Sequence, residues 1–356
     1  MAVRIGFVGV GYIAKQHLKR VLADPEAEVV ALCDTAPQAA EATRRSVLEA
    51  LRGAVPERVL TAFAGLPVHT DPFRFFQQER LDAVFLCLPP FVHGEVEFAA
   101  IEAGVPFLVE KPVALDLRTA TAISRALRDR GLIGAAGYQS RYADIVPYVR
   151  SRLDGRTVAM TLAHRFTKLP GRDWYRHQDR SGGQVVEMAT HQVDLLRLLV
   201  SDISTVYVSG GRRIATRAES EIFDTAAASL TYTNGAVGSL VTNMVSGHGN
   251  PAFARGIHII ADGLTVSVLG HEGESRTVEV VTAEGREERE FTDDSMAAQD
   301  RAFVRAVRDG RPELVLAPYE EAVRTLATTL AHQQSAQSGL PVRVDELLGA
   351  EVPSLS

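Results

Sequence analysis

The sequence predicts an α/β fold, with an N-terminal Rossmann-type, doubly wound parallel sheet and a C-terminal α/β domain containing a large, open, mostly antiparallel sheet. Strand-like and helix-like segments alternate over residues 1–137, which is typical of parallel strands joined by crossover helices. After Tyr138 the rhythm changes, and residues 203–281 are strand-like with turn signals between them. At about 150 residues per domain, 356 residues suggest two domains. We expect them at 1–138 and 139–356.

Each element of the first half follows from its pattern. Short apolar runs predict strands, and 3.6-residue periodicity between them predicts helices. We interpret 50–66 as an elongated surface helix with a loop. The strand-like runs are "VRIGFVG" at 3–9, "EVVALCD" at 28–34, "LDAVFLCLP" at 81–89, "VPFLVEK" at 105–111 and "LIGAAGY" at 132–138.

The second half begins with a helix near 141–153 and the strand-like "RTVAMTLAHRF" at 156–166. A polar loop at 167–181 leads to an apolar helix at 182–199. Strand-like segments then follow one another, consistent with an open sheet covered on one face by helices. Two further helices are expected at about 294–308 and 318–337.

Composition excludes some function classes. The formal charge is −6, from 38 basic and 44 acidic residues, and this balance does not indicate nucleic-acid binding. No apolar run reaches the length of about 18 residues that a membrane span needs. The N-terminus enters a strand without a signal-peptide pattern. We therefore expect a cytoplasmic protein without membrane or nucleic-acid partners.

The two cysteines, Cys33 and Cys87, are expected in the second and fourth strands of the sheet. Both strands would flank the first, which places them two strand spacings, about 9.6 Å, apart. A disulfide needs Cα atoms closer than about 7 Å. We therefore expect buried, reduced thiols.

A dinucleotide-binding fingerprint follows the first strand. "GVGYIA" places Gly9, Gly11 and Ala14 in the G-x-G-x-x-A spacing, which permits a tight turn, close approach of a pyrophosphate and close helix packing. Tyr12 and Ile13 complete the expected contact. Asp34 ends the second strand, where its carboxylate can accept hydrogen bonds from ribose hydroxyls and repel a 2′-phosphate. This favours NAD over NADP; the alternative for Asp34 is a helix cap.

Two further strand ends carry candidate cofactor residues. Leu88 and Pro89 end the fourth strand, and His93 follows as either a helix cap or a cofactor contact. "VEKP" ends the fifth strand with Glu110 and Lys111. Because ligands of doubly wound sheets bind beyond the carboxyl ends of the strands, Lys111 is expected in the nicotinamide crevice. A surface ion pair is the alternative.

The stretch "GGQVVEMATHQVDLLRLL" at 182–199 is apolar yet carries Glu187, His191 and Asp194. At 100° per residue these three fall along one narrow stripe of a helix. A solvated helix face usually carries long charged side chains of both signs, so this stripe indicates a functional site.

Taken together, the glycine fingerprint, "EKP", "GYQSRY" and "GG" followed by Glu-x-x-x-His-x-x-Asp resemble the Gfo/Idh/MocA family of glucose-fructose oxidoreductases and inositol dehydrogenases. The resemblance implies a Rossmann domain and a substrate domain whose open sheet forms a homodimer or homotetramer. It also implies that Lys111, often followed by a cis-proline, contacts nicotinamide and substrate, and that His191 is the acid/base residue.

This chain departs from the family pattern at two places. Glu187 stands where inositol dehydrogenases commonly have an aspartate, which puts inositol itself in doubt as the substrate. Tyr138 and Gln139 replace the commoner phenylalanine-asparagine pair, and we place Tyr138 at the substrate and Gln139 at the cofactor.

The chemistry fits these residues. Oxidation of a secondary alcohol needs a base that titrates near neutrality, which a histidine does. We hypothesise that His191 is the base, Lys111 the oxyanion stabiliser and Glu187 the residue that orients His191. No second histidine stands at the spacing of a zinc-binding helix, so no metal is expected.

The loop "HRFTKLPGRDWYRH" offers substrate contacts. Arg165 leaves room for an acidic or phosphorylated sugar, and Trp174 suits the C–H face of a sugar ring, with a loop anchor as its alternative. Asp194 is either a substrate-hydroxyl acceptor or a support for His191.

The leading hypothesis is an NAD-dependent dehydrogenase of a sugar, cyclitol or related polyol. One alternative is an enzyme that retains its NAD(P) for a redox-neutral sugar conversion or glycoside cleavage. The other is a non-catalytic protein that senses NAD or a sugar, which the apparently complete set of Lys111, Glu187 and His191 argues against.

Overall fold

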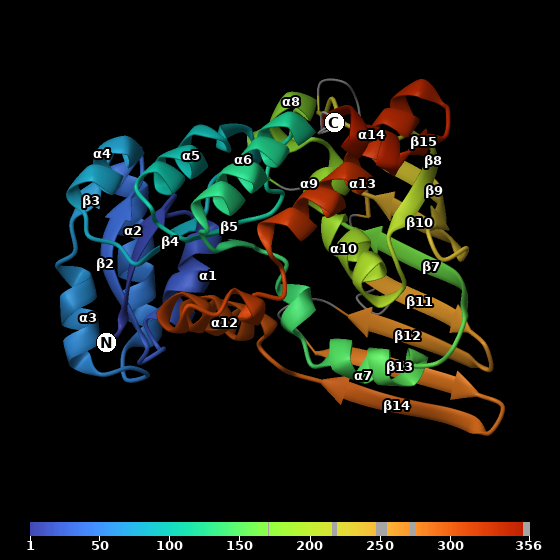
Figure 1. Ribbon diagram of the computed structural model, residues 1–356, viewed down its shortest axis with the longest axis horizontal. Coiled ribbons are helices and arrows are strands. Elements are labelled where there is room, and N and C mark those ends of the chain that lie inside the picture. The colour runs from blue at the N-terminus through green and yellow to red at the C-terminus, as the bar shows by residue number, and fades with distance from the viewer. Residues whose placement is uncertain (170, 216–218, 247–254, 271–274, 352–356) are drawn as a thin grey trace. The chain divides into compact units, whose positions relative to one another are not determined.

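The computed structural model describes residues 1–351 apart from 170, 216–218, 247–254 and 271–274 (Figure 1). The chain forms two compact units. The first contains residues 1–114, 119–139 and 296–321. The second contains 115–118, 140–295 and 322–356. In the part of the chain that is described, no helix is long and apolar enough to cross a membrane.

The first unit contains a six-stranded sheet with the order β3-β2-β1-β4-β5-β6, in which all pairs are parallel. This confirms the predicted doubly wound sheet. The short β3 was not predicted, because two residues carry too little pattern. The strands are β1 (Val3–Val8), β2 (Ala27–Cys33), β3 (Val68–His69), β4 (Ala83–Leu86), β5 (Phe107–Val109) and β6 (Gly134–Ala136).

The crossover helices follow the predicted order. The extension at 50–66 contains the end of one helix, a turn at Gly53 and a second short helix. The helices are α1 (Tyr12–Val21), α2 (Pro37–Leu51), α3 (Glu57–Ala64), α4 (Pro72–Gln78), α5 (Glu95–Glu102), α6 (Leu117–Arg130) and α12 (Ser295–Asp309).

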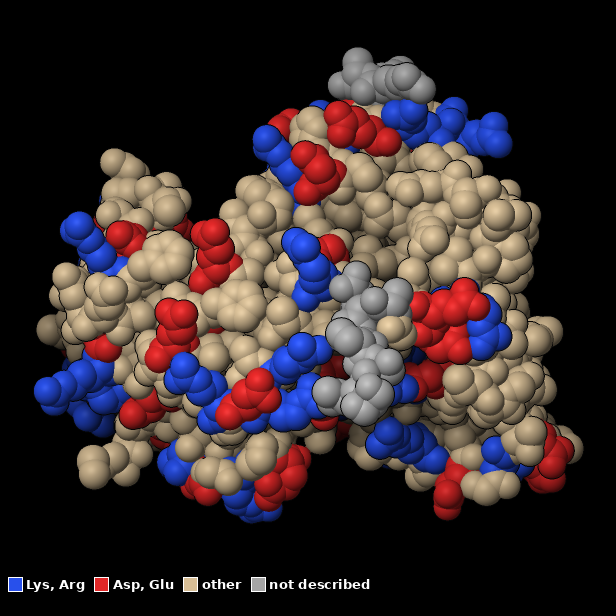
Figure 2. Space-filling model, turned by 45° about the horizontal axis from the view of Figure 1, so that its top comes forward, with Lys and Arg blue, Asp and Glu red and all other residues tan. Residues whose placement is uncertain are grey.

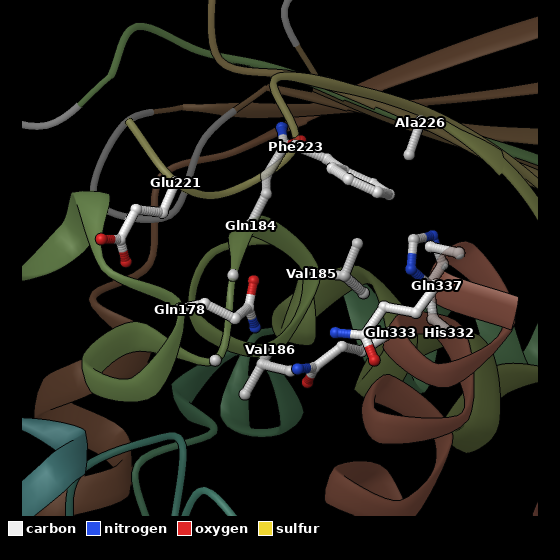
Figure 3. Close-up of a pocket in the computed structure, with 13 residues that line it drawn as sticks. Gln178, Gln184, Val185, Val186, Glu221, Phe223, Ala226, His332, Gln333 and Gln337 are labelled. Carbon is white, nitrogen blue, oxygen red and sulfur yellow. The ribbon is translucent and has the colours of Figure 1, made fainter. Parts of the chain in front are cut away.

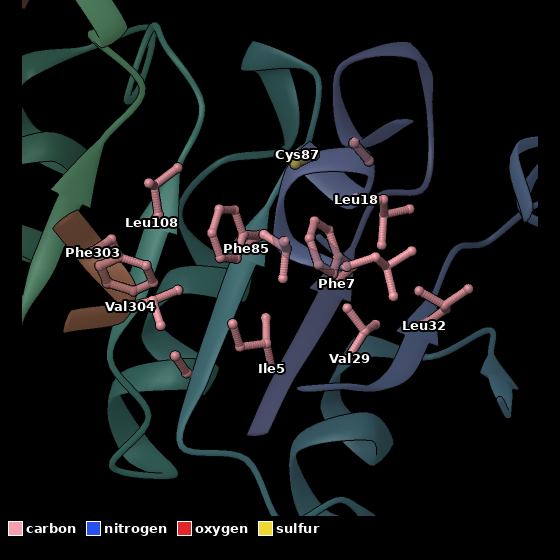
Figure 4. Packing of buried hydrophobic residues seen from close by; sticks show 14 of the residues in the cluster. Ile5, Phe7, Leu18, Val29, Leu32, Phe85, Cys87, Leu108, Phe303 and Val304 are labelled. Atoms are coloured by element: carbon pink, nitrogen blue, oxygen red, sulfur yellow. The ribbon is translucent and has the colours of Figure 1, made fainter. Parts of the chain in front are cut away.

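Aromatic side chains fill the core of the first unit. Phe7 and Phe85 on neighbouring strands stack with ring centroids 4.9 Å apart, and Phe303 meets Phe85 edge-on at 5.5 Å. All three are fully buried, and Figure 4 shows Phe303 and Val304 of α12 beside the strands. A segment from near the C-terminus therefore completes the core of the N-terminal sheet.

The cysteine prediction is confirmed. Cys33 ends β2 and Cys87 directly follows β4, with β1 between these strands, and both are free and buried. Burial raises the pKa of the Cys33 thiol to about 12, so this thiol stays protonated near neutral pH.

The second unit contains a nine-stranded sheet with the order β14-β13-β12-β11-β7-β10-β9-β8-β15. Among the described strands of this sheet, only the β7–β10 pair is parallel, as predicted for a mostly antiparallel sheet. The last two strands lie beyond the predicted strand region. The strands are β7 (Val158–Phe166), β8 (Ile203–Gly211), β9 (Thr225–Tyr232), β10 (Val237–Asn243), β11 (Arg255–Ala261), β12 (Leu264–Gly270), β13 (Arg276–Thr282), β14 (Gly285–Phe291) and β15 (Val342–Arg343).

The two faces of this sheet differ. Side chains of β9 alternate between buried and exposed, as expected when helices cover only one face. Short 3-10 turns lie at 139–142 and 173–176, the first where the predicted helix at 141–153 was expected to begin. The helices are α7 (Ile145–Leu153), α8 (Gln178–Ser181), α9 (Gln184–Glu187), α10 (Thr190–Leu199), α13 (Tyr319–Ser338) and α14 (Val344–Glu351).

The single helix predicted at 182–199 is wrong, because the segment is broken between α9 and α10. Gly182 and Gly183 have positive φ angles and precede α9. The Ala189 N–H donates to the carbonyl of Gln184, five residues earlier, and Ala189 then serves as the N-cap of α10. Angles counted around one continuous helix therefore do not describe how Glu187 stands relative to His191.

Candidate functional site

The glycine fingerprint forms a loop with no room for larger residues at its first position. Gly9 has φ +80°, and a Cβ there would lie 2.5 Å from the carbonyl oxygen of Cys87. At Gly11, no described atom lies within 4 Å of a Cβ position, so the backbone is open to a ligand. Ala14 is fully buried, which allows α1 to pack closely. These are the properties that a pyrophosphate cradle requires.

Asp34 connects the end of β2 to this loop. Its Oδ2 accepts a hydrogen bond from the Val10 N–H at 2.7 Å, and its Oδ1 accepts one from the Ala36 N–H at 2.8 Å. Ala36, not Asp34, is the N-cap of α2. The carboxylate is therefore fixed beside the glycine loop, where a ribose would be bound.

The remaining predicted cofactor residues of this edge lie around the same strand ends. Tyr12 is 64% exposed at the start of α1, and Ile13 is half-buried. Leu88 and Pro89 follow β4. His93 is not the helix cap, because Gly94 is the N-cap of α5. The backbone N–H of Gly94 donates to the Glu97 carboxylate. Glu97 also binds Nδ1 of His93 at 2.5 Å, while the buried Nε2 has no partner among the described residues.

Glu110 lies in a buried cluster that the sequence did not reveal. His17 of α1 is fully buried, and its Nδ1 donates to Asp300 of α12 at 2.8 Å. Its Nε2 donates to Glu110 at 3.1 Å. Burial lowers the pKa of His17, but the charge of Asp300 and the hydrogen bonds to both carboxylates outweigh it and raise this pKa to about 10. His17 is therefore a cation at neutral pH.

The other oxygen of Glu110 faces Lys111. It accepts the Lys111 backbone N–H at 3.2 Å, and a Cβ on Gly137 would lie 2.6 Å from the Glu110 carboxylate. The Lys111–Pro112 peptide is cis, as the family resemblance implies. Glu110 thus holds the backbone of Lys111 in place, and its predicted cofactor contact stays a prediction.

Tyr138 and Gln139 follow β6. The Tyr138 side chain is 1% exposed, so it belongs to the interior of the protein. Gln139 begins the 3-10 turn at 139–142 and is half-buried.

Glu187 and His191 lie on either side of the break between α9 and α10. They are 5% and 6% exposed, respectively. Burial of a carboxylate and an imidazole on adjacent short helices is costly unless the two groups compensate each other or a ligand. Lys111 belongs to the first unit, whereas Glu187 and His191 belong to the second.

Asp194 is part of a buried ion pair. Arg141, from the "GYQSRY" motif, donates Nε to Oδ2 at 2.8 Å and Nη2 to Oδ1 at 2.7 Å. The Thr325 hydroxyl also donates to Oδ1 at 2.8 Å. Asp194 is fully buried, and both of its oxygens are occupied. This arrangement supports a structural role for Asp194 over a substrate-hydroxyl acceptor.

The predicted substrate residues Arg165 and Trp174 lie in different environments. Arg165 is 5% exposed on β7, and its Nη1 donates to the side chain of Gln192 at 3.4 Å. Trp174 is half-buried and stacks on Tyr175 with ring centroids 3.8 Å apart. Pro170 of the same loop lies outside the described residues. Within the described ranges, no group of three His, Cys, Asp or Glu side chains could hold a metal.

Two family models match the chain. One, described as "Oxidoreductase family, NAD-binding Rossmann fold", covers residues 3–138. The other, described as "GFO/IDH/MocA C-terminal domain", covers residues 147–286. Together they span most of the sequence. The chain belongs to the GFO/IDH/MocA family of oxidoreductases, and the predictions of this family and of NAD as cofactor are confirmed.

Individual relatives agree with this assignment. The scyllo-inositol 2-dehydrogenase (NAD(+)) of Bacillus subtilis (strain 168) is 24% identical over 96% of both chains. The inositol 2-dehydrogenase of Rhizobium meliloti (strain 1021) is 29% identical over 57% of this chain and 56% of its own. The solved structure of the WlbA dehydrogenase from Bordetella pertussis, in complex with NADH and UDP-GlcNAcA, has a TM-score of 0.76 at 24% identity. It covers 96% of this chain and 99% of its own, and it supports the same fold.

The His17 cluster makes stability depend on pH. His17→Leu leaves Glu110 and Asp300 buried without their cation, and we expect the free energy of unfolding to fall by about 3–5 kcal/mol near pH 6.5. The folded-state pKa of His17, about 10, lies above the unfolded value, so its contribution is full below about pH 6.5 and is lost as pH rises through 10. Denaturant titrations from pH 6.5 to 10 measure this difference.

A matched control is His177→Leu. His177 pairs with Asp173 and Glu221 at 3.3 Å, but these carboxylates are largely exposed, so we expect a loss below about 1 kcal/mol. A difference between wild type and His17→Leu that stays constant over this pH range would contradict a charged His17.

Proposed function

We propose that the protein oxidises a secondary hydroxyl of a sugar, cyclitol or related polyol, with NAD as hydride acceptor. In this proposal the first unit binds NAD, and the second binds the substrate and forms the oligomer contact. The observation that carries the proposal is the burial of both Glu187 and His191 in a chain whose first unit has the dinucleotide cradle at Gly9, Gly11 and Asp34. The inositol and sugar dehydrogenases among its relatives support this substrate class.

The residues of the first unit fit NAD. Gly9 and Gly11 would hold the pyrophosphate, since a side chain is excluded at Gly9 and the space at Gly11 is open. Asp34 would accept the ribose hydroxyls while its carboxylate stays anchored to Val10. The buried Nε2 of His93, without a partner among the described residues, is available for a further polar contact. When bound, NAD accepts the hydride that leaves the carbinol carbon.

His191 supplies the base in this proposal. As hydride leaves, the hydroxyl becomes acidic, and an imidazole can take up its proton near neutral pH. The resulting imidazolium is a buried cation, because His191 is 6% exposed. Glu187, buried beside the same helix break, balances that charge and restricts the orientation of the imidazole.

Lys111 is proposed to stabilise the oxygen that loses its proton. A lysine ammonium donates up to three hydrogen bonds and carries the positive charge that a developing alkoxide requires. Its backbone is held by Glu110, whose other oxygen is fixed by the His17 cation. The buried cluster therefore positions the start of the Lys111 side chain without removing its charge.

The outer face of the nine-stranded sheet supports a homodimer or homotetramer. Met160, Leu162, Tyr207 and Val237 are each more than 40% exposed. Strand register places Val237 beside Met160, and Ser239, the next residue on the same face, beside Leu162. An apolar face of this kind is typical of an interface. We also propose a cytoplasmic location, where the free thiols Cys33 and Cys87 stay reduced.

On the face shown in Figure 2, basic side chains are interspersed with acidic ones. A small uncharged or weakly charged substrate is compatible with a formal charge of −6.

His191→Ala tests the base. We expect kcat for NAD-dependent oxidation to fall at least about 100-fold, because a positioned general base contributes that much or more. A panel of cyclitols and sugars, monitored at the absorbance of reduced nicotinamide, identifies the substrate for the measurement. The acid limb of the pH profile of kcat should disappear in the variant. His258→Ala, a half-buried histidine on β11, serves as the control; retention of a tenth of wild-type kcat by His191→Ala would contradict the assignment.

Asp34→Asn tests cofactor choice. The amide keeps the size of the carboxylate but removes the charge that repels a 2′-phosphate, so we expect the ratio of kcat/KM for NADP to that for NAD to rise at least about tenfold. Asp24→Asn, in the turn after α1, is the matched control and should leave the ratio unchanged. If this NADP-to-NAD ratio of kcat/KM were equal in wild type and Asp34→Asn, Asp34 would not contact the ribose.

Leu162→Glu tests the oligomer contact. A buried, unpaired carboxylate at an apolar interface is costly, so sedimentation velocity should show a lower mass than for wild type. Leu316→Glu introduces the same charge at an exposed leucine of the first unit and should leave the mass unchanged. An unchanged mass for Leu162→Glu would place the interface elsewhere.

A further inference from the structure

The second unit contains a cavity of about 130 Å³ beside α9. Three segments form its wall: the stretch from α8 to α9, residues 221–226 at the start of β9, and the C-terminal part of α13. Figure 3 shows Gln178, Val185, Phe223 and His332 around this space. Neither Glu187 nor His191 is among the described residues that line it.

Buried nitrogen atoms in this wall have no hydrogen-bond partner. They are Nε2 of Gln178, Gln184 and His332, for which the described residues offer no hydrogen-bond acceptor in range. Gln184 and His332 are each only 5% exposed. A buried polar group without a partner costs about 1–3 kcal/mol, and native structures contain few of them. All three side chains line this one cavity, so a ligand bound there would supply partners that the described chain does not.

The charge of the wall favours a neutral ligand. Burial lowers the pKa of His332 to about 4, so this imidazole is uncharged at neutral pH. No lysine or arginine is among the described lining residues. Glu221 lies at the exposed rim and pairs with His177 at 3.3 Å. A phosphate or carboxylate would therefore enter the cavity without a compensating cation, which is costly.

The polar groups favour hydroxyls. An amide presents two donors and one acceptor, and a neutral imidazole presents one of each. Because a hydroxyl both donates and accepts, several hydroxyls on one ligand could satisfy these groups together. Val185, Phe223 and Ala226 form an apolar part of the wall. An aromatic ring such as that of Phe223 suits the C–H face of a saturated ring.

The volume limits the ligand to one ring. An engineered apolar cavity of about 150 Å³ holds a benzene molecule. At 130 Å³ this cavity is smaller, so it holds no more than one ring, and the substituents of a six-membered ring would extend through its open side.

We propose that this cavity binds one uncharged, hydroxyl-bearing six-membered ring, a cyclitol or pyranose, in addition to the substrate that is oxidised. The inference does not depend on His191, Lys111 or NAD. Binding and turnover can therefore be measured separately, and failure of one proposal leaves the other open to its own test.

The experiment uses the full chain without NAD, so that no turnover occurs. The probes are myo-inositol and methyl α-glucopyranoside. Isothermal titration calorimetry measures their binding to the protein. Two variants change the cavity: His332→Leu removes a polar group, and Ala226→Leu fills space. We expect each to weaken binding of at least one probe tenfold or more. Gln334→Leu is the matched control, because Gln334 is exposed on the same helix and does not line the cavity.

Two further measurements make the result decisive. Glucuronate, a pyranose with a carboxylate, should bind at least tenfold more weakly than the neutral pyranoside. Circular dichroism and thermal unfolding show whether each variant is folded. If His332→Leu does not fold, Ala226→Leu still tests the cavity.

The proposal is overturned if neither probe binds wild type, which would mean that water alone occupies the cavity. It is also overturned if both cavity variants bind the probes as wild type does. If His332→Leu raises KM for the oxidised substrate in parallel with its loss of binding, the cavity holds the substrate itself, and a second site is excluded.

Discussion

The first unit depends on one buried cation. The His17 imidazolium bridges Asp300 and Glu110, and so joins α1, the end of β5 and α12, three segments far apart in the sequence. Two carboxylates buried without a cation would repel each other and lose their hydration, which is far more costly than one ion pair gains. The same interaction fixes the oxygen of Glu110 that holds the Lys111 backbone. Stability of the Rossmann unit and the position of its proposed catalytic lysine therefore share one cause.

The second unit also contains a buried ion pair that joins segments far apart in the sequence. Asp194 of α10 is held by both donors of the Arg141 guanidinium and by Thr325 of α13. Arg197 donates to Thr325 and to Asp202, which extends the network along α10. Because a bidentate arginine fixes both position and orientation, α10 cannot rotate without breaking it. His191 lies on that helix, so the ion pair between Asp194 and Arg141 fixes the position of the proposed base.

Local patterns sufficed to predict most strands of both sheets, the glycine loop and the place of Asp34 at the end of β2, because strand runs and fingerprint spacing are properties of neighbouring residues. The buried clusters could not be predicted in this way. His17 and Asp300 are 283 positions apart, and nothing near His17 distinguishes it from an ordinary histidine on a helix. Arg141 lies inside a recognised motif, yet its partner is 53 residues away. The break at Met188 and Ala189 also escaped prediction, since neither glycine nor proline interrupts "VVEMATHQV".

That break changes the reason for pairing Glu187 with His191. In one continuous helix the two would be neighbours by periodicity alone, one turn apart. With α9 and α10 separate, burial is the property that the two groups share: both are more than nine-tenths buried on consecutive short helices. A proton taken up by a buried imidazole creates a charge that the interior opposes, and a nearby carboxylate is the group able to offset it. A glutamate reaches one methylene further than the aspartate common among inositol dehydrogenases. In the proposed site, this extra reach lets Glu187 orient His191 from the other side of the break between α9 and α10.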